Sequence, residues 1–148
     1  MLRLSKLADY GTQVMTYMAR DRAVHSASEV AADLGIAAPT VSKILKVLVR
    51  RGLVASVLGA KGGYVLTRDP GEISIVEIIN AMDGPISITE CSSASTCSLE
   101  STCSTRSNWQ GINSIILGAL EKVNLAGMIA PKPQVVDVSA IRSRGIMV

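Results

Sequence analysis

Several residue types and patterns are scarce or absent in this sequence, and their scarcity narrows the range of functions. The chain has no phenylalanine, one tryptophan and one histidine, and no nucleophile is paired with a base. The glycine-rich segment 59–63 lacks the Lys-Ser/Thr pair of a phosphate-binding loop. No apolar run approaches the roughly 18 residues of a membrane span, and residues 1–10 lack the apolar core of a signal peptide. We therefore expect a cytoplasmic protein that is not an enzyme, does not associate with membranes and has no small-molecule substrate.

Length and composition indicate a small helical protein. Of its 148 residues, 48% are hydrophobic but only 3% are aromatic. This allows one compact domain and a helical extension, packed through aliphatic side chains. We expect part of this apolar surface to close a homodimer.

Acidic residues are unevenly distributed along the chain. Residues 1–68 hold ten Lys and Arg against four Asp and Glu, whereas residues 69–148 hold five against eight. No acidic residue lies between Leu34 and Arg68. Such a distribution attracts a polyanion to the amino-terminal half, although a basic, solvated face explains the charge equally well.

Periodicity and capping signals predict a mainly α fold with a small β wing. Ser26 and Ser74 are each followed three residues later by glutamate, the spacing of a capping box at a helix start. Two short strands, 53–58 and 64–67, flank the glycines of segment 59–63 and predict a hairpin. The predicted helices cover residues 4–19, 26–34, 39–51, 74–82, 105–123 and 125–129. This order is that of a winged helix-turn-helix domain followed by a long helix.

The third predicted helix has the composition of a helix that enters a DNA major groove. One side is apolar at helical spacing and would pack on the protein, through Val41, Ile44, Leu45 and Leu48. The other side carries short polar and cationic side chains, as contact with base edges requires. Arg50 and Arg51 are placed for phosphates, and Lys61 at the hairpin tip for a minor groove. The predicted contacts to double-stranded operator DNA are Pro39, Thr40, Ser42, Lys43, Lys46, Arg50, Arg51 and Lys61.

Some of these residues, and two residues near them, have a simpler structural interpretation. Thr40 and Ser42 are ordinary polar residues for a helix start, and Tyr64 is expected to be a packed strand residue. His25, in the turn before the second helix, is expected to be solvated. It is the combination of the hairpin with the acid-free segment that favours DNA binding.

All three cysteines lie in one segment rich in Ser and Thr. Five residues separate Cys91 from Cys97, and five separate Cys97 from Cys103. An odd number of thiols argues against a disulfide framework, and structural zinc sites usually contain a closer Cys pair. The wide spacing suits an iron–sulfur cluster, [2Fe–2S] or [4Fe–4S]. Redox-active thiols without a metal are the alternative.

Five stretches of the chain resemble one known family. They are residues 4–10, 39–46, 59–64, 89–91 and 108–109, and the similarity extends from residue 1 to about residue 131. The family is that of the iron–sulfur-dependent winged-helix regulators IscR, NsrR and RirA. Within it, the chain looks most like the proteobacterial regulators of SUF-type iron–sulfur assembly.

The residue patterns and the resemblance together predict an organisation in four parts. They are a DNA-binding domain at 1–84, a cluster-binding loop at 85–104, a dimerisation helix at 105–130 and a flexible tail at 131–148. The helix is implied to cross its two-fold mate, and its expected interface residues are Trp109, Ile112, Ile116, Leu120 and Val123.

The resemblance also suggests a fourth cluster ligand. Some assembly regulators use a histidine three residues after the last cysteine, where this chain has Arg106. The nitric-oxide-sensing branch uses an aspartate from the first helix of the partner chain, and Asp9 occupies that position. We therefore expect Asp9 of the partner subunit to join the three cysteines, the alternative being that Asp9 is an ordinary exposed helix residue. Leu58 stands where some relatives have a wing arginine, which leaves Lys61 as the candidate for the minor groove.

The resulting hypothesis is a transcriptional regulator, expected to repress an iron–sulfur assembly (SUF) operon, with cluster occupancy controlling operator binding. One alternative is a regulator of the same fold that senses nitric oxide or thiol redox state. A more remote alternative is an iron–sulfur electron carrier that does not bind DNA.

Overall fold

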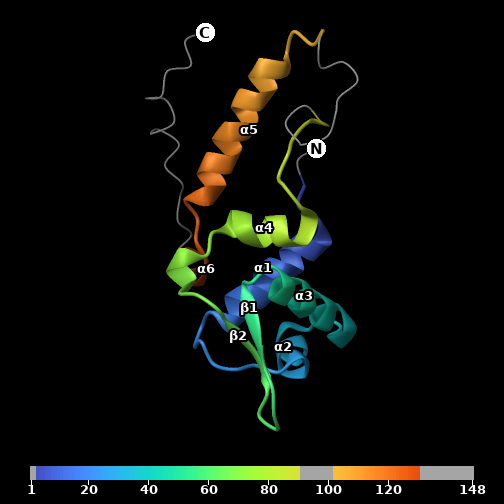
Figure 1. Ribbon diagram of the computed structural model, residues 1–148, viewed down its shortest axis with the longest axis vertical. Helices are drawn as coiled ribbons and strands as arrows, with labels where there is room; N and C mark the ends of the chain where they lie inside the picture. Colours follow the sequence, from blue (N-terminus) through green and yellow to red (C-terminus); the bar gives the residue numbers. More distant parts are fainter. Residues whose placement is uncertain (1–2, 91–101, 131–148) are drawn as a thin grey trace.

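The computed structural model describes residues 3–90 and 102–130 (Figure 1). Cys91, Cys97 and the predicted tail at 131–148 lie outside these ranges. The elements are α1 (Lys6–Met18), α2 (Ala27–Leu34), α3 (Ala38–Arg50), β1 (Val54–Val57), β2 (Gly63–Leu66), η1 (Pro70–Glu72), α4 (Ile75–Asp83), α5 (Arg106–Glu121) and α6 (Leu125–Ile129). The predicted winged-helix class and the predicted elements are confirmed, with element boundaries within two residues of those expected.

Local capping sets the helix boundaries. The Ser26 and Ser74 hydroxyls accept from the backbone N–H groups of Glu29 and Glu77, each at 3.2 Å, and both capping boxes are complete. Ser5 caps α1 by accepting from the Ala8 N–H at 3.0 Å. Gly35 follows α2 with φ 64°, in the left-handed region that favours glycine.

The wing is an antiparallel pair in which Val54 lies opposite Leu66 and Val57 opposite Gly63. Outside this pair, His25 forms an isolated antiparallel bridge to β2, because it exchanges two backbone hydrogen bonds with Tyr64. Close approach needs a glycine here, since a Cβ on Gly63 would lie 2.4 Å from the His25 carbonyl oxygen. The wing is therefore tied to the turn between α1 and α2.

The core forms where α1, α3 and α4 meet. Val14, Met15 and Met18 of α1 and Ile78 of α4 are completely buried, as are the four apolar residues that the sequence assigned to the inner side of α3. Gly11 lets α1 approach α4 closely, because a Cβ at this position would lie 2.8 Å from Met82 Cγ. A displacement of α1 would therefore shift the packing of both α3 and α4.

The carboxyl end of the long helix α5 is fastened to this body by backbone hydrogen bonds. The Ile75 N–H donates to the Val123 carbonyl, and the Leu125 N–H donates to the Ile73 carbonyl, both at 2.9 Å. Leu125 of α6 is completely buried. Figure 1 shows α5 rising away from the body, with the wing extending from the opposite end. None of the helices in the described ranges combines the length and apolar character that crossing a membrane requires.

Candidate nucleic-acid interface

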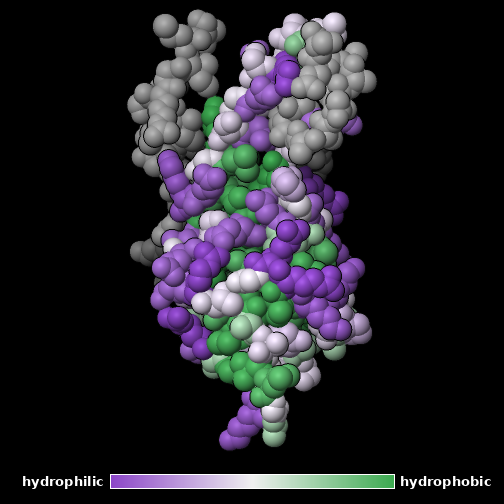
Figure 2. Space-filling view, viewed as in Figure 1, coloured by the Kyte–Doolittle hydropathy of each residue, from purple (hydrophilic) through white to green (hydrophobic). Residues whose placement is uncertain are grey.

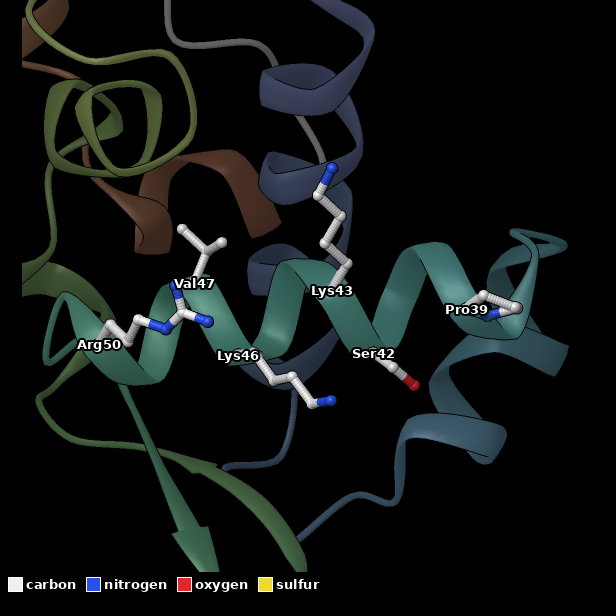
Figure 3. Close-up of a pocket in the computed structure, with 6 residues that line it drawn as sticks. All are labelled: Pro39, Ser42, Lys43, Lys46, Val47 and Arg50. Carbon is white, nitrogen blue, oxygen red and sulfur yellow. The ribbon is translucent and has the colours of Figure 1, made fainter.

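The outer surface of α3 forms a shallow hollow of about 410 Å³. Its lining residues are Pro39, Ser42, Lys43, Lys46, Val47 and Arg50 (Figure 3). Ser42 and Lys46 lie along one edge of the helix, and Lys43 and Val47 lie along the other. Pro39, in the first turn, has a φ suited to a helix start and no N–H that would lack a partner there. Five of the eight residues predicted to contact DNA therefore share one surface.

The cations on this surface are not neutralised within the described residues. Lys43, Lys46 and Arg50 form no ion pair with any described carboxylate. In contrast, Arg22 pairs with Asp69 at 2.9 Å, and Arg68 pairs with Glu77. Cations without protein partners are available to phosphate oxygens.

The remaining predicted DNA contacts lie elsewhere. Thr40 is half-buried on α3 and does not line the hollow. Arg51, the carboxyl-terminal cap of α3, borders a second hollow of about 210 Å³ beside Glu77 and Asn80 of α4. Lys61 is exposed in the wing turn, as expected.

The wing tip presents an apolar side chain beside this lysine. Leu58 is 94% exposed. The turn depends on glycine, because Gly59 has φ 113° and a Cβ on Gly62 would lie 2.4 Å from the Val57 carbonyl oxygen. The tip is therefore narrow and can approach another surface closely.

The expectation that His25 is solvated was wrong. His25 is only 5% exposed. Its Nε2 lies 2.9 Å from Asp21 Oδ1, and its Nδ1 lies 3.1 Å from Glu29 Oε1. The His25 backbone pairs with the wing strand and its ring meets the Tyr17 ring, contacts that the sequence pattern does not reveal. Burial alone would lower the pKa of His25, but the hydrogen bonds to Asp21 and Glu29 raise this pKa above its usual value of 6.5.

Only part of the predicted cluster site is in the described ranges. Cys103 is half-buried, two residues before Thr105, the residue that precedes α5. The Thr105 hydroxyl, 3.5 Å from Cys103 Sγ, and the Thr105 backbone N–H lower the pKa of the thiol. Asp9 is exposed on α1, and its carboxylate accepts from the Gln13 side chain at 3.2 Å.

Two asparagines hold the chain that leads into the cysteine segment. Asn80 Oδ1 of α4 accepts from the Ile86 N–H at 3.2 Å, and Asn113 Oδ1 of α5 accepts from the Ile88 N–H at 3.1 Å. Asn113 is 6% exposed. Sequence reasoning missed both residues, although a polar Asn113 beside the apolar stripe of a long helix was an available signal.

The residues predicted at a dimer interface are divided along α5. Trp109 and Ile112 are 39% and 41% exposed. Ile116 is half-buried, whereas Leu120 and Val123 pack against the core of their own chain. On the face shown in Figure 2, apolar side chains are visible alongside the lower part of α5, just above α4.

Comparisons with known proteins agree with this geometry. Residues 4–131 match the Rrf2 family, described as iron-dependent transcriptional regulators. The chain is 31% identical over 105 residues to the HTH-type transcriptional regulator IscR of Cronobacter sakazakii, covering 71% of this chain and 64% of that protein. The IscR of an Enterobacter species is 30% identical over the same shares. The chain thus spans less than two thirds of the length of these curated relatives.

Solved structures of transcriptional regulators are also similar to this chain. The cysteine regulator CymR of B. subtilis has a TM-score of 0.72 and 26% identity, covering 87% of this chain and 97% of that one. The IscR of T. potens has a TM-score of 0.69 and 29% identity, covering 86% of each chain. The predicted resemblance to IscR is confirmed, and these relatives are regulators, not enzymes. The chain belongs to the Rrf2 family of transcriptional regulators.

Proposed function

We propose that this chain is a homodimeric repressor of a SUF-type iron–sulfur assembly operon, with an iron–sulfur cluster setting its affinity for the operator. The observation that carries the proposal is the outer surface of α3. Its cations have no carboxylate partner among the described residues, and they lie in a segment without acidic residues. A polar, cationic helix surface with a buried apolar back is what a major groove accepts.

The exposed part of α5 supports the proposal of a dimer. Trp109 and Ile112 expose large apolar surfaces on a helix that projects from the body, and a two-fold partner would cover them. A dimer also presents two copies of α3, which must lie about 34 Å apart, or a multiple of it, to enter successive major grooves. Helix α5 would set this separation.

The available donors fit an iron–sulfur cluster. Thiolates are its preferred ligands, and the lowered pKa of Cys103 favours the thiolate form. Cys91, Cys97 and Cys103 would hold the cluster, with Asp9 of the partner subunit as the fourth ligand. The Asp9 carboxylate is exposed, and its hydrogen bond to Gln13 uses one oxygen, so the other can meet a second chain. When bound, the cluster supplies a centre that responds to iron, oxygen or nitric oxide.

The chain's own residues would transmit the state of that site. Asn113 links the segment before Cys91 to α5, and α5 is joined to α4 through Ile75 and Val123. Asp9 lies on α1, which packs against both α3 and α4. A change at the cysteines would therefore alter the angle between α5 and the DNA-binding helices.

A thiol switch without a metal is the second candidate. The similarity to CymR, the global cysteine regulator of B. subtilis, favours it, as does the lowered pKa of the Cys103 thiol. In that case alkylation of the thiols would abolish the response to the signal, whereas iron chelation would not.

Anaerobic native mass spectrometry tests the proposal, because it reports the dimer and the cluster mass together. We expect a brown dimer containing iron and sulfide in equal amounts. Asp9→Ala should accelerate cluster loss in air, whereas Glu121→Ala, which removes an exposed carboxylate from α5, should not. A colourless protein with stoichiometric zinc would refute the cluster.

A further inference from the structure

One residue, His25, contacts the wing, the end of α1 and the start of α2. The His25 backbone pairs with Tyr64 at the start of β2, through hydrogen bonds of 2.9 and 2.8 Å. Its imidazole contacts Asp21, which follows α1, and Glu29 in the first turn of α2. Glu29 is also the glutamate of the α2 capping box. The position of the wing and the start of the helix-turn-helix thus depend on the same residue.

The geometry specifies the protonation state of this imidazole. Both ring nitrogens lie within hydrogen-bond distance of a carboxylate oxygen, 2.9 and 3.1 Å away. An ionised carboxylate only accepts hydrogen bonds, and a neutral imidazole has a single N–H to donate. A neutral ring would place a nitrogen lone pair against a carboxylate oxygen. Both contacts are favourable only when the ring is the cation.

The two cations nearest the ring have partners of their own, since Arg20 lies over the Tyr17 ring, 5.9 Å from its centroid, and Arg22 pairs with Asp69. The titratable and charged groups on the elements packed against it are Tyr17, Arg20, Asp21, Arg22, Glu29, Asp33 and Tyr64. The Tyr17 ring meets the imidazole edge to face at 5.0 Å. The Tyr17 hydroxyl donates to Asp33 at 2.6 Å, and this bond raises its pKa to about 12, so Tyr17 stays neutral.

We propose that His25 is a protonated positioning residue that fastens the wing to the helix-turn-helix, so that loss of its proton loosens the wing and weakens DNA binding. This inference rests in part on the proposed function, because its consequence is measured on DNA. The raised pKa of His25 sets the direction in which stability changes with pH. Protonated His25 stabilises the folded protein fully below about pH 6.5, and this stabilisation is lost as the pH rises through the higher pKa of His25 in the folded protein.

The single histidine makes the first test direct, because its imidazole resonances need no assignment. We expect an NMR titration in which His25 has a pKa above 6.5, so that at pH 6.5 the form with both ring nitrogens protonated is the major one. A pKa at or below 6.5, or a neutral tautomer at pH 6.5, would overturn the inference. Neither result depends on DNA binding.

The matched variants are Glu29→Gln and Glu72→Gln. Both glutamates are the third residue of a capping box, and glutamine preserves that role, but only Glu29 touches His25. Glu29→Gln should lower the pKa of His25, speed hydrogen exchange of the Tyr64 amide and weaken binding to a SUF-promoter duplex about threefold to tenfold at pH 7, about 0.6–1.4 kcal/mol. Glu72→Gln should change none of these.

Equal Tyr64 exchange rates in the two variants would refute the positioning role. If the unmodified protein failed to bind the duplex at every pH, the proposed function would be contradicted, whereas the titration and exchange results would still decide the state of His25.

Discussion

Asn113 accepts a hydrogen bond from the Ile88 N–H across 3.1 Å, and this bond connects α5 to the chain three residues before Cys91. Asn113 is buried. Asn113→Ala would leave the Ile88 N–H without its acceptor, and we expect a loss of about 1–3 kcal/mol in the free energy of unfolding. Urea denaturation measures it. Ser114→Ala, the neighbouring exposed position that bonds only within its own helix, should cost under about 0.5 kcal/mol; equal losses would contradict the role of Asn113.

The packing of α1 on α4 predicts a coupled pair of substitutions. A side chain larger than hydrogen at Gly11 meets Met82, so Gly11→Val should lower the free energy of unfolding by about 1–3 kcal/mol through overpacking. In a double-mutant cycle with Met82→Ala, the two changes should compensate by about 0.5–3 kcal/mol. Additive effects would show that the two residues do not constrain each other.

The cationic surface of α3 predicts which lysines support DNA binding. Lys43→Ala and Lys46→Ala should each weaken binding to the promoter duplex by about 1–3 kcal/mol where a guanine edge is contacted. A phosphate contact would instead reduce the slope of log affinity against log salt by about 1. Fluorescence anisotropy over a salt series separates the two cases. Lys122→Ala, which removes an exposed lysine after α5, is the control and should leave both affinity and slope unchanged.

The pair of Arg68 and Glu77 predicts a pH dependence of stability. Burial alone would raise the pKa of Glu77, but hydrogen bonds from Arg68 and the Ser74 N–H hold it below its usual 4.5. Because its pKa is lowered, ionised Glu77 stabilises the folded protein above about pH 4.5, and this stabilisation is lost as the pH falls through the pKa of Glu77 in the folded protein. Arg68→Met should therefore destabilise the protein at pH 7, and the difference should shrink as the pH falls below 4.5. A difference independent of pH would rule out the electrostatic explanation.

Local signals were sufficient for most of the fold. The capping residues Ser26 and Ser74 and the spacing of Val41, Ile44 and Leu45 act within one or two helical turns, so the sequence predicted them correctly. The bridge between His25 and Tyr64 joins residues some forty positions apart in the chain, and no periodicity records it. Asn113 and Gly11 likewise acquire their roles only through tertiary packing.

The α3 surface could be predicted from the sequence, whereas the environments of individual residues around it and on α5 could not. The cations of α3 were predictable because an amphipathic helix separates its two sides by sequence spacing alone. The sequence pattern could not distinguish Arg50 from Arg51, which the structure places beside different hollows. Which residues of α5 are exposed and which pack on their own core was also unpredictable, since Trp109 and Leu120 share one stripe but not one environment.

The dependence of operator binding on the cluster is the central claim. The most direct test is an anaerobic anisotropy titration of the SUF-promoter duplex with one preparation of the dimer, before and after removal of its iron and sulfide, across a range of salt concentrations. The account predicts that the two forms differ in affinity by about tenfold or more, equivalent to about 1.4 kcal/mol. Equal affinities at every salt concentration would contradict it.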